Sequence, residues 1–302
     1  MLTPDELDMR IIRELGGSAS PYWNVWESYS AVSRKLGVDE ETVRTRINRA
    51  RERGFLPAWR VMVNPMLIGC LEAVLDIEVR EEQRKVDAVS KVRLVDGVYY
   101  IDDFRGRGML VGLYHPSGEE LARKVRLIES ICGSDSVSWE RPVPRPNVRM
   151  RRLDWQIIEA MGEDAWRDLR EVAKATGVST RTIQRRLAAM KEGKAIYLSR
   201  PPNVSAAGGL MCNFLVRCDE GKKRAADYAI LSAFNRIGAS DTSQDGFSIF
   251  GMSCQNYAEA DAMVEKLRAI EGVVDVRLRV LKEIIVIRDW LEAQVAMRAR
   301  EG

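Results

Sequence analysis

The sequence repeats itself, and this repeat constrains the fold more than any other feature. The segment LDMRIIRELG at residues 7–16 matches LDWQIIEAMG at residues 153–162. A second pair of matching segments reads VSRKLGV at residues 32–38 and VAKATGV at residues 172–178. The 302 residues are therefore predicted to form two related halves.

The two pairs of matches differ in spacing, because the first half holds extra residues around positions 16–27. This GGSASPYWNVWE stretch starts with Gly, Ser and Pro, so a loop is predicted, with Trp23 and Trp26 packed onto the domain. The halves meet at RPVPRPN, residues 141–147, where three prolines favour a stiff, extended linker.

Each half is predicted to begin with a helix-turn-helix. In the first half, apolar residues at helical spacing predict helices over residues 4–15, 29–36 and 39–53. Gly37 permits the left-handed residue that a tight turn needs, and Asp39 stands where a helix cap is expected. The segment that follows, from Phe55 to Val63, is predicted to form a strand or wing.

The second half repeats this order. Gly177 stands at the turn, Ser179 at the cap, and a wing strand is expected from Ile196. A helix pair with Gly at the turn and a cap directly after it is typical of DNA-binding helix-turn-helix motifs. Two copies in register strengthen the prediction of DNA binding.

The distribution of charge agrees with this prediction. The chain has 47 Lys and Arg against 44 Asp and Glu, a net charge of +3, so the whole chain is only weakly basic. Residues 34–54 hold seven basic and four acidic residues, and residues 170–194 hold seven basic and two acidic residues. Positive charge is thus concentrated where a helix would meet phosphates.

The third helix of each motif is expected to contact DNA with the face opposite its apolar stripe. The predicted contact residues are Thr42, Arg44, Thr45, Arg46, Asn48 and Arg49 in the first half and Arg181, Thr182, Gln184, Arg185 and Arg186 in the second. Arg suits guanine and phosphate, whereas Asn and Gln suit adenine. Arg46 and Arg186 directly precede core residues, so they are expected to grip the DNA backbone or brace the fold. Glu41 corresponds to Arg181, so the two motifs are expected to differ in strength, sequence preference, or both.

The remainder of each half is predicted to be a ferredoxin-like βαββαβ domain, which makes the fold class α+β. The expected elements cover residues 72–79, 81–92, 97–102, 109–114, 117–130 and 137–139 in the first half, and 210–218, 221–234, 239–243, 247–253, 257–269 and 273–281 in the second. A last helix over residues 285–300 has no counterpart, and it could serve assembly or cover its own sheet. The predicted domains are residues 1–62, 63–140, 141–150 as linker, 151–202 and 203–302.

These features resemble the Lrp/AsnC transcription regulators. The resemblance rests on the L-D-x-x-I-I opening, the Gly-Val turn and the segment NPMLIG at residues 64–69, which NVSAAGG at residues 203–209 follows loosely. It implies a sequence-specific regulator that binds double-stranded DNA and pairs through its βαββαβ domains, which could also bind a small-molecule effector. A fused tandem looks like a covalent form of that dimer, and further homo-oligomers through the α/β domains are left open. Family members commonly carry Gly-x-x-Asp near an amino-acid pocket, and neither DFRGRGM at residues 103–109 nor SQDGF at residues 243–247 matches it well.

The alternative function is enzymatic. Siroheme decarboxylases resemble Lrp/AsnC proteins and also pair two related halves, so a siroheme-decarboxylase-like or tetrapyrrole-binding protein is the second hypothesis. Such a site would need basic side chains and a proton donor, and Arg105, Arg107 and His115 are the candidates if their strands pair. The many Arg residues of the third helices are not required for catalysis, so a regulator without catalytic residues or a cofactor is predicted.

Composition argues against several other classes. The five cysteines are scattered and only one histidine is present, so no zinc site is predicted and the thiols are expected to be reduced and buried. No apolar run approaches the roughly 18 residues of a membrane span, and the acidic start MLTPDELDMR is not typical of a signal peptide. A cytoplasmic protein without membrane contact is expected.

Overall fold

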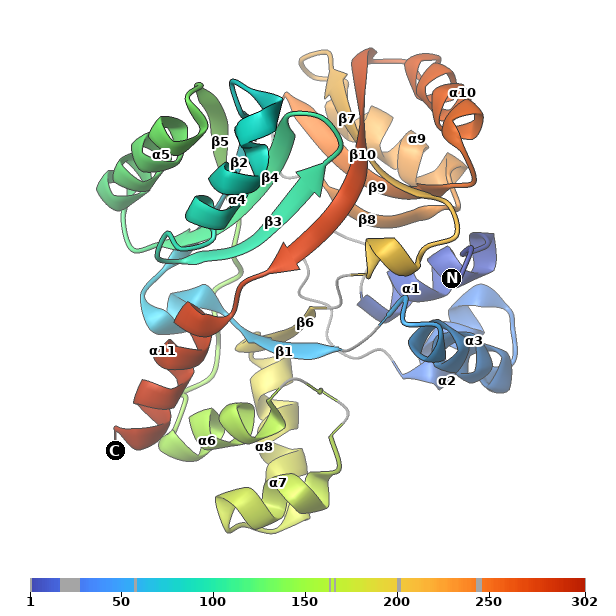
Figure 1. Ribbon diagram of the computed structural model, residues 1–302. Coiled ribbons are helices and arrows are strands. Elements are labelled where there is room, and N and C mark those ends of the chain that lie inside the picture. The colour runs from blue at the N-terminus through green and yellow to red at the C-terminus, as the bar shows by residue number, and fades with distance from the viewer. Residues whose placement is uncertain are drawn as a thin grey trace. The chain divides into compact units, whose positions relative to one another are not determined.

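The computed structural model describes residues 2–16, 28–56, 59–162, 164–165, 167–199, 202–242 and 246–301 (Figure 1). The predicted loop with Trp23 and Trp26, and most of the SQDGF segment, lie outside these residues. The chain divides into two compact units. Unit 1 comprises Met1–Pro57, Asp102–Gly108 and Pro201–Ile284, and unit 2 comprises Ala58–Ile101, Met109–Arg200 and Ile285–Gly302.

Each unit combines segments of both halves. Unit 1 holds the first helix-turn-helix (HTH1) with the second βαββαβ domain, and unit 2 holds the second helix-turn-helix (HTH2) with the first βαββαβ domain. The five domain ranges expected from the sequence stay a prediction. The grouping across the halves is a feature that the sequence repeat does not indicate.

Unit 1 contains HTH1 and the helices and antiparallel strands of the second βαββαβ domain. Its elements are α1 (Glu6–Gly16), α2 (Tyr29–Leu36), α3 (Glu40–Glu52), the 3-10 turn η3 (Val204–Ala206), β7 (Leu210–Cys218), α9 (Lys223–Ala233), β8 (Ile237–Asp241), β9 (Phe247–Cys254), α10 (Tyr257–Arg268) and most of β10 (Val273–Val286). The strand order is β10-β7-β9-β8. Phe214, Ile230, Phe250 and Leu267 are fully buried in its core, between the sheet and its two helices.

Unit 2 contains HTH2, most of the first βαββαβ domain, two short strands and the last helix. Its elements are β1 (Arg60–Val63), η1 (Pro65–Ile68), β2 (Leu71–Glu78), η2 (Glu82–Arg84), α4 (Lys85–Val92), the first part of β3 (Val98–Phe104), most of β4 (Gly108–His115), α5 (Gly118–Cys132), β5 (Ser136–Arg141), α6 (Arg152–Met161), α7 (Leu169–Thr176), α8 (Thr180–Glu192), β6 (Ile196–Ser199) and α11 (Asp289–Arg300). The strand order is β5-β2-β4-β3. Val92, Ile101, Val111 and Ile128 are fully buried in its core.

The predicted order of elements, and with it the α+β fold of two repeats, is confirmed. The strand expected as a wing after each helix-turn-helix is shorter than predicted in the first half, and the two such strands pair with each other. β1 and β6 run antiparallel, with Arg60 opposite Ser199 and Val63 opposite Ile196. β10 continues to Val286, beyond its predicted end, because the apolar and charged residues of VLKEIIV extend the strand pattern.

The five cysteines are free thiols and all are buried, as predicted. Burial raises the pKa of the Cys132 thiol to about 11, which keeps it protonated near neutral pH. Among the described helices, none combines the length and apolar character needed to cross a membrane.

Candidate nucleic-acid interface

HTH2 is built from α6, α7 and α8, and its geometry follows from three local signals. Gly177 adopts a left-handed conformation, with φ of 71°, and ends α7. The Ser179 hydroxyl then accepts a hydrogen bond of 3.2 Å from the Thr182 backbone amide and caps α8. Ile183 and Met190 are fully buried, which fixes the inner face of α8. The opposite face exposes Arg181, Gln184 and Arg185 in the first two turns, while Thr182 is half-buried.

Arg186 lies at the edge of that face, and its side chain is bound by a carboxylate of α6. Its Nε donates a hydrogen bond of 2.6 Å to Asp154, a carboxylate of α6 that is fully buried. Asp154 also accepts a bond of 2.7 Å from the Arg151 backbone amide, so it caps α6 and holds α8 at the same time. The hydrogen bond with Asp154 raises the pKa of Arg186. Arg186 therefore braces the two helices, one of the two roles expected for it.

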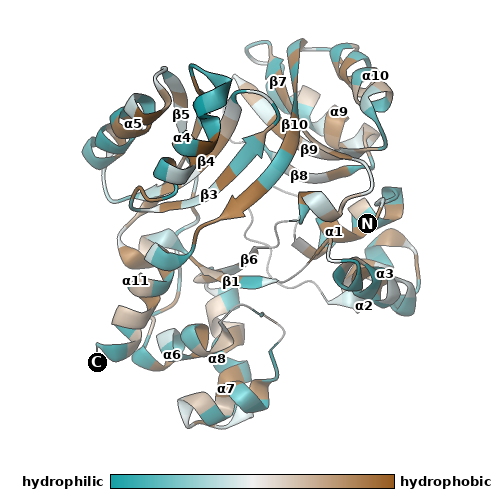
Figure 2. Ribbon diagram, in the orientation of Figure 1, coloured by the Kyte–Doolittle hydropathy of each residue, from teal (hydrophilic) through white to brown (hydrophobic). Residues whose placement is uncertain are grey.

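HTH1 has the same frame. Gly37 is left-handed, with φ of 67°, and Asp39 occupies the cap position of α3, although its side chain makes no capping hydrogen bond. Val43, Ile47 and Ala50 are buried and fix the inner face. The charged composition of α3 makes it mostly teal in Figure 2.

Two predicted contact residues of HTH1 are held by carboxylates of α1 and the residue before it. Arg46 Nη1 lies 2.7 Å from an Asp5 oxygen and 2.9 Å from an Asp8 oxygen, and Arg49 Nη2 lies 2.8 Å from Asp8. The Asp8 side chain is only 4% exposed. Hydrogen bonding to Asp5 raises the pKa of Arg46. Arg46 and Arg49 thus tie α3 to α1, as Arg186 ties α8 to α6.

The remaining predicted contacts of HTH1 lie on the outer face of α3. Arg44 Nη2 donates to Glu40 at 2.8 Å and its Nε lies 3.4 Å from Glu41, while its guanidinium carbon stands 5.6 Å from the centre of the Tyr29 ring. Thr45 Oγ1 contacts Glu41 at 3.4 Å. Thr42 is half-buried and Asn48 is exposed. DNA contact by all eleven residues stays a prediction.

Sequence reasoning missed the acidic partners, Asp5, Asp8 and Asp154. A signal for two of them was present. Asp8 and Asp154 are the Asp of the repeated L-D opening, and Arg46 and Arg186 also occupy corresponding positions in the third helices. An acidic and a basic residue that recur together in both copies indicate an ion pair that both copies need.

The last helix also belongs to this region, within unit 2. α11 packs against α6 (Figure 1), and Leu291 and Val295 are buried on its inner side. Arg152 Nε donates to the Ala299 carbonyl at 3.0 Å, and the Arg298 guanidinium stands 5.6 Å from the centre of the Trp155 ring. The helix without a counterpart therefore supports HTH2.

The residues considered for catalysis do not form a described cluster. His115 is fully buried in unit 2, with Nδ1 3.0 Å from the Ser117 carbonyl and Nε2 3.6 Å from Glu140. Arg105 and Arg107 are exposed and belong to unit 1, at the opposite end of β4. Within the described part of the chain, no group of three or more His, Cys, Asp or Glu side chains could hold a metal ion.

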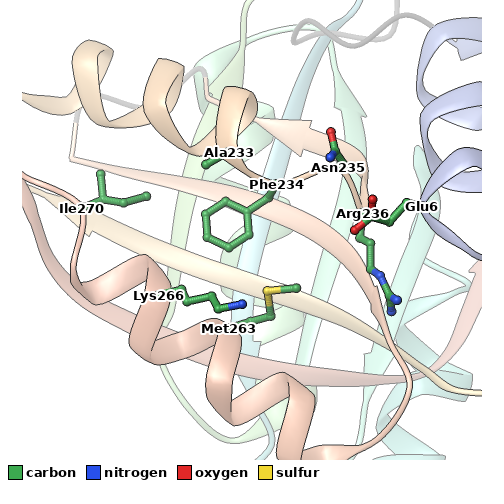
Figure 3. A pocket seen from close by; sticks show the side chains of 8 residues that line it. All are labelled: Glu6, Ala233, Phe234, Asn235, Arg236, Met263, Lys266 and Ile270. Atoms are coloured by element: carbon green, nitrogen blue, oxygen red, sulfur yellow. The ribbon is translucent and has the colours of Figure 1, made fainter. Parts of the chain in front are cut away.

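Unit 1 has a hollow of about 340 Å³ beside α1, close to the lower end of the volumes that hold small ligands. Phe234, Met263 and Ile270 give it an apolar lining, while Glu6 and Arg236 lie at one end (Figure 3). Arg236 is already paired with Glu259, at 3.1 Å. The effector expected from the family resemblance stays a prediction.

Comparison with known proteins identifies the second helix-turn-helix. Residues 150–191, which cover all but the last residue of HTH2, match the AsnC-type helix-turn-helix domain. The HTH-type transcriptional regulator Ptr1 of Methanocaldococcus jannaschii is 26% identical over 145 residues, which cover 48% of this chain and 85% of that protein. The uncharacterized HTH-type transcriptional regulator PH0140 of Pyrococcus horikoshii is 36% identical over 85 residues, 28% of this chain and about half, 49%, of that protein.

Among solved structures, the siroheme decarboxylase NirDL in complex with an iron-uroporphyrin III analogue aligns with a TM-score of 0.57 and 14% identity, over 97% of this chain and 98% of that chain. At this identity the likeness shows the fold alone. Escherichia coli AsnC aligns over 45% of this chain with a TM-score of 0.38 and 21% identity. The resemblance to the Lrp/AsnC transcription regulators is confirmed, since residues 150–191 match the AsnC-type helix-turn-helix and HTH-type transcriptional regulators are among the homologues.

Proposed function

We propose that this chain regulates transcription by binding double-stranded DNA in a sequence-specific way, and that it is not an enzyme. One observation carries the proposal most directly. Arg181, Gln184 and Arg185 are exposed together in the first two turns of α8, and within the described residues none of them has an acidic partner. The N-terminal residues of a recognition helix are those that reach base edges in a major groove.

The mechanism follows from the frame of HTH2. The Asp154–Arg186 pair fixes α8 against α6, so the helix enters the groove as a rigid body. Arg185 or Arg181 would then make paired hydrogen bonds to guanine, and Gln184 to adenine. Lys174, exposed on α7, would contact the phosphates on one side.

The test is an anisotropy titration of the duplex that lies upstream of the gene for this chain, repeated at several salt concentrations. Several phosphate contacts require an affinity that falls steeply with salt. Arg185→Ala should weaken binding by about 1–3 kcal/mol if the side chain reads a base edge. Arg93→Ala removes the same charge from an exposed site outside both helix-turn-helix motifs and should leave the affinity unchanged. Binding that does not change with salt would reject the proposal.

The enzymatic alternative requires a proton donor that substrate can reach. His115 is fully buried and its ring contacts the Ser117 carbonyl and Glu140, which supports a structural role. Titration of iron uroporphyrin into the protein, followed by absorbance, separates the hypotheses. We expect no spectral change, whereas a saturable shift would favour a tetrapyrrole-binding protein.

A further inference from the structure

We infer that the two helix-turn-helix motifs have different tasks: HTH2 reads DNA, while the outer face of HTH1 is neutralised by its own carboxylates and HTH1 serves mainly to cover a sheet edge. This inference rests on the proposed function. It assigns one DNA-reading helix to each chain, although each chain contains two helix-turn-helix motifs.

The first difference is the charge at the start of the third helix. In HTH1 this segment is Asp39, Glu40 and Glu41, three acidic residues at the end that would enter a groove. The corresponding segment of HTH2 is Ser179, Thr180 and Arg181, which has no acidic residue and one basic residue. Acidic side chains stabilise a helix N-terminus, but they repel the phosphates that line a groove.

The second difference is whether the outward-facing side chains of the second turn have bonding partners within the protein. In HTH1, Arg44 is bound by Glu40 and Glu41 and lies over the Tyr29 ring, and Thr45 also contacts Glu41. Any contact with a base must first break these bonds. The corresponding residues of HTH2 are Gln184 and Arg185, which are exposed without such partners among the described residues.

The third difference is the number of arginines in the third helix that are not paired with carboxylates in or beside the first helix. HTH2 uses one Arg for its brace, Arg186, on the buried Asp154. HTH1 uses both Arg46 and Arg49, held by Asp5 and Asp8. Apart from Arg44, which is paired with Glu40 and Glu41, the remaining arginine of α3 is Arg51, in the last turn, away from the end that reads bases in this class of motif.

HTH1 has a structural role, because its first helix packs on the sheet of unit 1. α1 packs against β8, the last strand in the order β10-β7-β9-β8 of unit 1. Met9 of α1 approaches Gly238 so closely that a Cβ on this glycine would lie 2.4 Å from the methionine methyl group. Just before α1, the Leu2 backbone amide donates to Ala206 at 2.8 Å and its carbonyl accepts from Gly208 at 2.7 Å. A covered edge strand is protected from pairing with other chains.

The experiment compares the loss of one outward-facing arginine from the third helix of each motif, in the full chain, by anisotropy with the upstream duplex. Arg185→Ala should weaken binding roughly 5- to 150-fold, the range for loss of a base contact. Arg44→Ala should change it less than about twofold. The double variant Glu40→Thr/Glu41→Arg gives HTH1 the first turn of HTH2, and it should strengthen binding by roughly tenfold or more and steepen the salt dependence. Both glutamates are exposed, so this variant keeps its fold.

Two results would overturn the inference while leaving the proposed function intact: equal losses with Arg44→Ala and Arg185→Ala, or an unchanged affinity in the double variant. The proposed function itself fails if the unaltered chain shows no salt-dependent binding. A scrambled duplex of the same length and composition separates a gain in specific binding from a general gain in charge attraction.

Discussion

At the scale of single residues, a buried carboxylate organises each helix-turn-helix. Asp154 is fully buried, yet it is bound by Arg186 and by the backbone amide of Arg151. Removing one partner of such a pair leaves the other without compensation, so Asp154→Ala should lower the free energy of unfolding by about 3 kcal/mol. Urea unfolding followed by the fluorescence of the chain's seven tryptophans, among them Trp155 next to Asp154 on α6, measures this loss. Asp5→Ala should cost under about 1 kcal/mol, because the Asp5 side chain is 53% exposed. A loss as large in Asp5→Ala as in Asp154→Ala would contradict the argument.

Asp5 also gives HTH1 a dependence on pH. Burial acts to raise the pKa of Asp5, but hydrogen bonds from Arg46 and from the Asp8 backbone amide outweigh it and leave this pKa below its usual value. A carboxyl with a lowered folded pKa stabilises the fold above its unfolded pKa, about 4, and this contribution is lost as the pH falls through the folded value. The difference in stability between the unaltered chain and Asp5→Asn should therefore be present at about pH 6 and shrink toward about pH 3. A difference that is constant over this range would show that Asp5 does not titrate with folding.

At the scale of helices and strands, the sequence predicts most boundaries, because the signals are local. The bounds of α2 agree with the predicted range, since Gly37 permits the left-handed turn that ends it. The pairing of β1 with β6 could not be predicted in the same way, because Arg60 and Ser199 are far apart in sequence and neither strand encodes its partner. The position of α11 could not be predicted either. Its apolar stripe indicates that one side of the helix is buried, but it does not indicate which element covers that side.

The contact of α11 with α6 gives a prediction for the C-terminal helix. Leu291 is 7% exposed, and Leu291→Ala should lower the free energy of unfolding of unit 2 by about 2 kcal/mol. Removal of residues 289–302 should also weaken DNA binding, because α6 carries the Asp154 carboxylate that positions α8. Met297 on the same helix is 42% exposed, so Met297→Ala serves as the control and should change neither property. Full DNA affinity in the truncated chain would show that HTH2 needs no support from α11.

At the scale of the whole molecule, the repeat predicts two halves and the order of elements in each, because the same patterns recur in register. It does not predict which helix-turn-helix packs with which sheet. That choice depends on contacts such as the Leu2 amide with the Ala206 carbonyl, between residues on different halves. Each half therefore contributes to both compact units: residues 1–57 group with 201–284, and most of the first βαββαβ domain groups with α11.

This exchange between the halves can be tested by cutting the linker. A site for a specific protease, inserted between Arg145, which is exposed, and Pro146, which is half-buried, would divide the chain into its two halves after folding. Because each compact unit contains both fragments, we expect them to elute together in size exclusion and to separate only in denaturant. The thermal midpoint of the cut protein should rise with protein concentration, since association has replaced a covalent link. The uncut protein with the same insertion is the control, and its midpoint should not depend on concentration. Fragments that separate without denaturant and each unfold cooperatively would instead show that every half folds by itself.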